Sequence, residues 1–293
     1  MVKSGQKIPD LPFAAPPGTP VGVQVMSLSE LAGRVVSHRL ARPHFHQLIT
    51  VTEGLLQQMV DFQTYELTPG AWLWVRPGQL QQWGALTGVT GGLVLFQPSH
   101  LDAQTAGNVQ LDDPDLPVLR QPSAADAVSV RMAFDHLALE FRALGRMPLE
   151  SHAATLRHLL AVLVLRLTHL AAPVAEHTVA ADPAYRSFRS AVDSDFTRTR
   201  RVEDYARSLG YSAKTLTRST QAAAGMSAKA FIDRRVVLEA KRLLAHGDDS
   251  AAQISQQLGF RTPTQFAKYF VQRTGQTPLA FRQSVQGVPS SAR

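Results

Sequence analysis

The residues best suited to chemistry in this chain are polar and cationic side chains that recur at helical spacing near the C-terminus. Four of them follow an i, i+3, i+4, i+7 pattern and so share one face of a predicted helix: Lys214, Thr217, Arg218 and Gln221. A second predicted helix carries three candidates of the same kind: Thr264, Gln265 and Lys268. Hydrogen-bond donors and positive charge on one exposed helical face are suited to binding the bases and phosphates of DNA. Among these residues, Arg218 has a planar fork that can donate two hydrogen bonds to guanine.

The elements that carry these residues occur twice. Residues 202–225 and 251–275 each read as an apolar helix, a Leu-Gly-aromatic turn and a second helix, with the turns at Gly210 and Gly259. Two short helices joined by a tight turn that contains glycine form the helix-turn-helix pattern, whose second helix enters the major groove of DNA. The alternative is a pair of surface helices whose charges are only solvated, which leaves the repeat unexplained.

The second helix of each copy has a predicted start and a predicted buried side. Ser212 and Thr262 can cap these helices by accepting a hydrogen bond from a free backbone N–H. The residues expected to face the core are Leu216, Thr220 and Ala223 in the first copy and Phe266, Tyr269 and Phe270 in the second. Between the copies, residues 228–247 predict a longer helix that ends at Gly247 and joins the two units as a rod.

Three segments within about the last 105 residues follow one another in a characteristic order: LGYSAKTLTR, RRVVLEAKRLLA and ISQQLGFRTPTQFAKYFVQRTGQTPLAFR. In this order and spacing they resemble the AraC/XylS family of transcription regulators. The resemblance implies sequence-specific binding to double-stranded DNA and, for an activator, contact with RNA polymerase. It assigns base contacts to the position of Arg218, with Lys268 at the equivalent place. Thr220 and Ser255 depart from the family pattern, which often has an aromatic residue and Ala there, and this suggests looser packing.

Composition indicates two domains with different partners. The chain has 293 residues and a net charge of +7, but residues 184–293 hold 18 Lys and Arg against 8 Asp and Glu, whereas residues 1–183 hold 12 against 15. This asymmetry indicates a polyanion partner for the C-terminal part alone. Cysteine is absent, so disulfides and thiolate chemistry are excluded, and no apolar run of about 18 residues predicts a membrane span. Because the first 20 residues lack the apolar core of a secretory signal, we expect a cytoplasmic protein without membrane association.

The N-terminal part predicts short strands separated by turns. The candidate strands are VGVQVM, HQLITV, LLQQMVDF, AWLWVRP and GLVLFQP, and many short strands at this spacing are typical of a β-sandwich or barrel. Residues 42–83 resemble the cupin-like sensor domain that precedes the DNA-binding half in many AraC/XylS regulators. The predicted fold class is therefore α+β with two domains: an N-terminal cupin-like β-barrel with two dimerisation helices, and a C-terminal all-α domain with two helix-turn-helix units.

The predicted barrel contains candidates for binding a small-molecule effector: His44, His46, Trp72, Trp74, Gln81 and Trp83. His44 and His46 would project to one face of a strand, as the first two ligands of a metal-dependent cupin do, but Glu53 and Gln81 do not complete such a ligand set. We therefore expect no metal or other cofactor and no catalytic residues. The aromatic residues indicate an apolar or aromatic effector, or else simply fill the core. A metal-dependent cupin enzyme with an appended DNA-binding domain is the alternative function.

Two further helices are predicted at residues 123–145 and 148–172, broken at Gly145 and Pro148. The second is so apolar, with Leu163 and Leu167 on its main stripe, that it needs two packing partners. We therefore expect a homodimer through this helix, with packing inside one chain as the alternative. The predicted boundaries are an extended N-terminal arm at 1–20, a sensing and dimerisation domain at 21–172, a linker at 173–183, the DNA-binding domain at 184–286 and a tail at 287–293.

Overall fold

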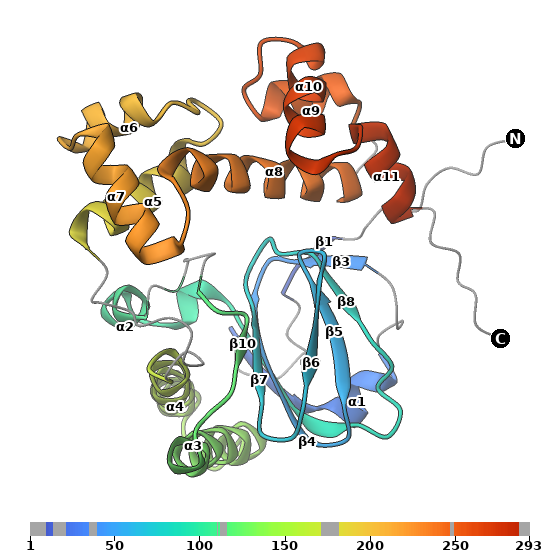
Figure 1. Cartoon of the computed structure of the whole chain (residues 1–293). Coiled ribbons are helices and arrows are strands. Elements are labelled where there is room, and N and C mark those ends of the chain that lie inside the picture. The colour runs from blue at the N-terminus through green and yellow to red at the C-terminus, as the bar shows by residue number, and fades with distance from the viewer. Residues whose placement is uncertain are drawn as a thin grey trace, which may run out of the picture. The chain divides into compact units, whose positions relative to one another are not determined.

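The computed structural model of the chain describes residues 10–13, 22–34, 40–109, 111, 116–170, 182–246 and 249–286. It divides into two compact units, one of Pro9–Glu176 and one of Met1–Ile8 with His177–Arg293 (Figure 1). Most of the predicted arm at 1–20, residues 173–181 of the predicted linker and the whole predicted tail at 287–293 lie outside the described residues. Within the predicted arm, Asp10–Leu11 (β1) pairs with a neighbouring strand in parallel.

The N-terminal unit contains two five-stranded sheets. The first has the order β1-β3-β8-β5-β6 and adds to β1 the strands Leu40–Pro43 (β3), Gln81–Trp83 (β8), Leu56–Val60 (β5) and Gln63–Leu67 (β6). The second has the order β10-β7-β4-β9-β2 and comprises Leu119–Arg120, Trp72–Val75, His46–Glu53, Thr90–Phe96 and Val23–Ser27. All five predicted strands are present, and the strands that the sequence did not suggest are short or polar.

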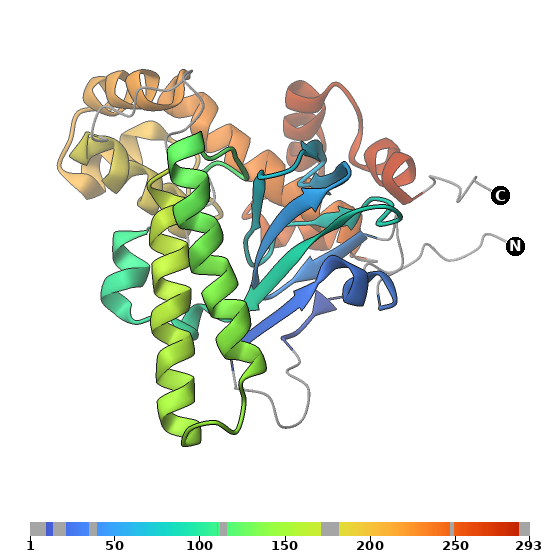
Figure 2. The same ribbon diagram turned by 90° about the horizontal axis from the view of Figure 1, so that it is seen from below.

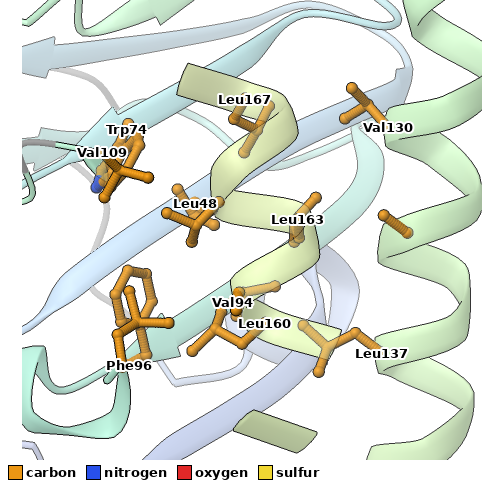
Figure 3. Close-up of a cluster of buried hydrophobic side chains, with 14 of the residues drawn as sticks. Leu48, Trp74, Val94, Phe96, Val109, Val130, Leu137, Leu160, Leu163 and Leu167 are labelled. Atoms are coloured by element: carbon orange, nitrogen blue, oxygen red, sulfur yellow. The ribbon is translucent and has the colours of Figure 1, made fainter. Parts of the chain in front are cut away.

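The second sheet is buried on both faces. One face contributes Ile49 and Leu73 to a core that also contains Leu56 and Leu67 of the first sheet, so the two sheets pack against each other. Successive side chains of a strand point to opposite faces, and Leu48, Trp74, Val94 and Phe96 accordingly lie in a different core with the two long helices (Figure 3). The unit therefore has three layers: the first sheet, the second sheet and a helical layer.

The helical layer is a hairpin of Ala124–Arg142 (α3) and Leu149–Thr168 (α4), which lie side by side against the sheet (Figure 2). Ser123 caps α3 by accepting a hydrogen bond from the backbone N–H of Asp126. Leu163 and Leu167 of α4 are 0% and 1% exposed because they fill the core between the sheet and α3. The expectation that these leucines form an exposed dimer surface is therefore wrong. Packing inside one chain accounts for the apolar character of α4.

Three short helical segments that the sequence did not suggest complete this unit: Leu28–Ala32 (α1), Pro98–His100 (η1) and Ala103–Asn108 (α2). None of the helices in the described part of the chain is both long and apolar enough to cross a membrane.

The C-terminal unit consists of helices. They are Pro183–Asp195 (α5), Val202–Leu209 (α6), Ala213–Ala224 (α7), Ala228–His246 (α8), Ala251–Gln257 (α9), Pro263–Thr274 (α10) and Pro278–Gln286 (α11). The first helix-turn-helix, α6 and α7, packs around the aromatic rings of Phe188, Tyr205 and Phe231. The second, α9 and α10, packs on Phe266 and Phe270, with Phe281 of α11 in contact with Phe270. The expected helix end at Gly247 lies outside the described residues.

Candidate nucleic-acid interface

The turn of the first helix-turn-helix unit is built as the sequence predicts. Gly210 ends α6 in the left-handed conformation with φ 72°, which glycine adopts without a steric penalty. Ser212 then caps α7, and its hydroxyl oxygen accepts a hydrogen bond from the backbone N–H of Thr215 at 3.0 Å. These two contacts fix where α7 begins and therefore which side chains it presents to solvent.

The outward face of α7 carries the four predicted DNA-binding residues together. Lys214, Arg218 and Gln221 are exposed and Thr217 is half-buried. All four line one hollow of about 760 Å³, to which Glu203 of α6 also contributes. This concave surface carries hydrogen-bond donors and two positive charges, which suits it to contact with the phosphate-lined edge of a DNA groove.

The inward face of α7 differs from the prediction at two residues. Leu216 and Thr220 are buried as expected, and the Thr220 hydroxyl donates to the carbonyl oxygen of Leu216 at 2.7 Å. Ala223 is exposed rather than buried because the last turn of α7 extends beyond the packing that covers Leu216. Ser219 is buried instead, and its hydroxyl donates to the carboxylate of Asp182, the cap of α5. That hydrogen bond is the main reason why the pKa of Asp182 lies below its usual value.

The second unit repeats the first with a less polar surface. Thr262 caps α10, and its hydroxyl accepts from the backbone N–H of Gln265 at 3.2 Å. Thr264, Gln265 and Lys268 are all exposed on α10, so the three predicted residues share an accessible surface. Phe266 is buried as expected, like Phe270.

Tyr269, expected in the core, is only half-buried, and its hydroxyl has a specific partner. It donates to Asp233 of α8 at 2.6 Å, and Arg273 binds the other oxygen of that carboxylate at 2.8 Å. Burial raises the pKa of the Tyr269 phenol, which keeps the phenol protonated and able to donate. Asp233 therefore anchors the recognition helix of the second unit to the connecting helix α8, a role that its position in the sequence did not reveal.

The second helix-turn-helix unit also contacts the segment between α5 and α6, which leads into the first unit. Arg200 donates a hydrogen bond to the carbonyl oxygen of Leu258, and its guanidinium lies 3.7 Å from the ring centroid of Phe260. Gly259, between Leu258 and Phe260, has φ +71° and packs against the carbonyl oxygen of Thr197. Helix α8, which packs against both α7 and α10, provides the other connection between the two units.

The predicted effector-binding residues do not come together in one place. His46, Trp72 and Trp74 lie on the face of the second sheet that packs against the helices. Trp83 lies in the core between the sheets, and Gln81 is buried beside Gln58, whose amide donates to it at 3.4 Å.

His44 is exposed and precedes β4, so it does not share a strand face with His46 as the sequence suggested. His46 is fully buried, and its Nδ1 accepts a hydrogen bond from the indole N–H of Trp74 at 3.1 Å. Within the described ranges, no three His, Asp or Glu side chains gather in a way that could hold a metal ion.

Comparison with known proteins identifies the class of the C-terminal unit. Residues 205–284 match the family described as "Helix-turn-helix domain". The regulatory protein PocR of Salmonella typhimurium is 31% identical over 94 residues, which is 32% of this chain and 31% of PocR. The HTH-type transcriptional activator RhaS of Klebsiella pneumoniae is 21% identical over 243 residues, which is 82% of this chain and 85% of RhaS. Residues 205–284 of the C-terminal unit therefore form a helix-turn-helix domain.

The extent of these matches differs between relatives. The chain spans less than a third of the length of PocR and of YisR from Bacillus subtilis. Among solved structures, ToxT from Vibrio cholerae aligns over 91% of this chain and 99% of its own, with a TM-score of 0.44 and 13% identity. The DNA-binding domain of AdpA, solved with a target DNA, aligns over 38% of this chain and 99% of its own, with a TM-score of 0.33 and 24% identity.

Proposed function

We propose that this protein is a sequence-specific, DNA-binding transcription regulator of the AraC/XylS type. The observation that carries the proposal is the exposed face of α7, on which Lys214, Thr217, Arg218 and Gln221 line one hollow. Its counterpart on α10 presents Thr264, Gln265 and Lys268. We assign contacts with double-stranded DNA to these seven residues. RNA polymerase is a further partner if the protein activates transcription.

The two recognition helices have different tasks in this proposal. Arg218 offers a bidentate fork, which suits the O6 and N7 atoms of guanine and discriminates between bases. Lys268 is a point donor beside the smaller Thr264, which suits contact with phosphate. The first unit therefore selects the sequence, and the second contributes affinity that depends less on sequence.

The proposal is tested by selection of DNA from a genomic pool with the purified full-length protein. Sequencing of the retained fragments should yield a shared motif, and Arg218→Ala protein should retain fragments in which that motif is weakened at one or two base pairs. Retention of fragments without any shared motif would contradict sequence-specific regulation and would favour a non-specific nucleoid role.

We also propose a homodimer, through α3 rather than α4. The outer face of α3 carries an apolar stripe at i, i+4 and i+11, formed by Val128, Met132 and Leu139, which are 62%, 66% and 62% exposed. Large apolar side chains gathered on one exposed helical face are typical of protein interfaces. Two copies of α3 related by a twofold axis would cover each stripe with the other.

A further inference from the structure

The helix-facing side of the second sheet contains a cluster of cationic and donor groups around one tryptophan ring. Leu48 pairs with Trp74 and Trp72 pairs with Arg120, so these residues share a sheet face. The guanidinium of Arg120 lies 6.0 Å from the Trp74 ring centroid, and that of Arg76 lies 4.9 Å from it. The surroundings are otherwise the apolar core that includes Trp72, Leu48 and Phe96.

Arg120 is the unusual member of this cluster. Its side chain is only 5% exposed, yet its Nε and Nη2 atoms have no hydrogen-bond partner among the described residues. Burial lowers the pKa of Arg120 to about 10. A buried guanidinium is ordinarily paired with a carboxylate because desolvation of an unpaired charge is strongly unfavourable. The burial of Arg120 and its two unpaired N–H groups are therefore typical of an arginine that binds an anionic ligand.

The two free atoms of Arg120 identify the shape of that anion. Nε and Nη2 lie on one edge of the guanidinium, and their N–H bonds point the same way, as the two prongs of a fork. This edge matches the two oxygens of a carboxylate, which can accept both hydrogen bonds at once. Arg76, by contrast, donates through Nη1 to the carbonyl oxygen of Leu116 at 3.2 Å.

His46 supplies a third unmatched donor on the same sheet face. Its Nδ1 accepts the hydrogen bond from the Trp74 indole, which can only donate. Burial lowers the pKa of His46 to about 3, so the ring is neutral and its proton lies on Nε2. That Nε2 atom has no partner among the described residues. A ligand oxygen would satisfy it, whereas a cation would not.

We infer that the helix-facing side of the second sheet binds an organic acid, whose carboxylate is held by the Nε and Nη2 atoms of Arg120. The apolar side chains around the fork, Trp72 and Trp74 above all, favour a carboxylate with an aromatic or aliphatic body over an inorganic anion. This inference goes beyond the proposed function, which concerns DNA binding, and adds an effector site in the N-terminal unit. It includes His46, Trp72 and Trp74 of the predicted effector set and leaves out His44, Gln81 and Trp83.

The inference is tested on the full chain by calorimetric titration with benzoate and octanoate, and with their neutral amides, benzamide and octanamide. Both acids should bind saturably and quench tryptophan fluorescence, and the amides should bind at least about tenfold more weakly, since a charge-assisted fork contributes about 1.4 kcal/mol or more. Arg120→Gln should weaken acid binding by a similar factor. Arg131→Gln, which removes an exposed arginine of α3, is the matched control and should leave acid binding unchanged.

A second variant separates the inference from a folding defect. If the Arg120 fork is unpaired without ligand, Arg120→Met should raise the Tm of the free protein and abolish the rise in Tm that the acids produce. A lower Tm for Arg120→Met would show that the guanidinium already has a partner and would overturn the inference. So would the absence of saturable, Arg120-dependent binding by both acids up to their solubility limits. Neither outcome depends on DNA, so failure here is distinguishable from failure of the proposed function.

A carboxylate of the chain itself is the competing occupant, and the same assay distinguishes it. Asp112, Asp113 and Asp115 are near Leu111 and Leu116 in sequence, and Leu111 belongs to the same core. The triple variant Asp112→Asn, Asp113→Asn, Asp115→Asn should bind benzoate with the wild-type affinity. Tighter binding by tenfold or more would show that one of these residues occupies the fork and would overturn the assignment to a free acid.

Discussion

Gly259 lies so close to the carbonyl oxygen of Thr197 that a Cβ atom at position 259 would penetrate that oxygen. Thr197 precedes the first helix-turn-helix unit, and Gly259 is the turn glycine of the second. This backbone contact therefore links the second unit to the segment that leads into the first, as the contact of Arg200 with Phe260 also does.

Gly259→Ala should consequently be more harmful than the equivalent change in the first unit. Gly210 has nearly the same φ of +72°, but no other heavy atom lies within 4 Å of its added Cβ. Gly210→Ala should lower the free energy of unfolding by about 1 to 2 kcal/mol, the penalty for the left-handed conformation. Gly259→Ala adds the collision with Thr197, for a total of about 2 to 5 kcal/mol.

Urea unfolding of the two alanine variants measures this difference, and DNA binding measures its consequence. Gly259→Ala should also weaken binding to a DNA site that both units contact, because the units move apart. Equal stability losses for the two variants would show that the Thr197 contact does not constrain the turn.

Met132→Glu tests the proposed dimer surface on α3, and Leu163→Glu, in the buried core, is the contrasting variant. Met132 is exposed on α3, so a glutamate there should leave the fold intact and convert a dimer into a monomer in light scattering. Leu163 is buried in the core, so a glutamate there buries an unpaired charge and should cost several kcal/mol of stability. The proposed α3 interface is wrong if Met132→Glu protein keeps the dimer mass.

His46 should make stability depend on pH. Burial lowers its pKa from the ordinary value of 6.5 to about 3, so between these two values the unfolded chain binds a proton that the folded chain does not. Stability must therefore fall as the pH falls through this window, by up to about 1.4 kcal/mol per pH unit from His46 alone.

His46→Gln removes this contribution and keeps a polar side chain beside Trp74. Urea unfolding between pH 6 and pH 4 should show a shallower loss of stability for the variant than for the wild type. His100, whose pKa burial also lowers, remains in both proteins and contributes to the slope that the variant keeps. Parallel pH profiles would mean that His46 is not buried as a neutral ring.

The double helix-turn-helix could be predicted because its signals are local. Glycine in the turn, a capping Ser212 or Thr262 and an apolar stripe act within one helix and its neighbour. The glycines and caps are present where expected, and four of the six predicted core residues are buried: Leu216, Thr220, Phe266 and Phe270. Contacts between segments that are distant in the sequence leave no comparable pattern in the sequence, so they could not be predicted. Arg200 reaches the carbonyl of Leu258 across 58 positions of sequence, and Asp233 holds Tyr269 across 36.

The sequence could not show which face of the second sheet each side chain occupies, and the reason is physical. All four residues of β7 are buried, since one face packs on the other sheet and the opposite face on the helices. Hydrophobic alternation therefore did not reveal that Trp72 and Trp74 lie on the helical side while Leu73 faces the other sheet. The prediction of a dimer interface on α4 failed for the same reason. A helix that packs between a sheet and α3 is as rich in leucine as a helix at a dimer interface, so composition does not distinguish the two.

The division of work between the recognition helices is the central claim, and one titration experiment tests it. Wild type, Arg218→Ala and Lys268→Ala proteins are titrated with the selected site and with point-substituted sites across a salt series. Arg218→Ala should lose about 1 to 3 kcal/mol on the selected site and discriminate less at one or two base pairs, with little change on unrelated DNA. Lys268→Ala should lose affinity for all sequences alike and reduce the salt slope by about 0.9 per lost phosphate contact. Equal losses on every sequence for Arg218→Ala would show that Arg218 contacts only the DNA backbone and would contradict the account.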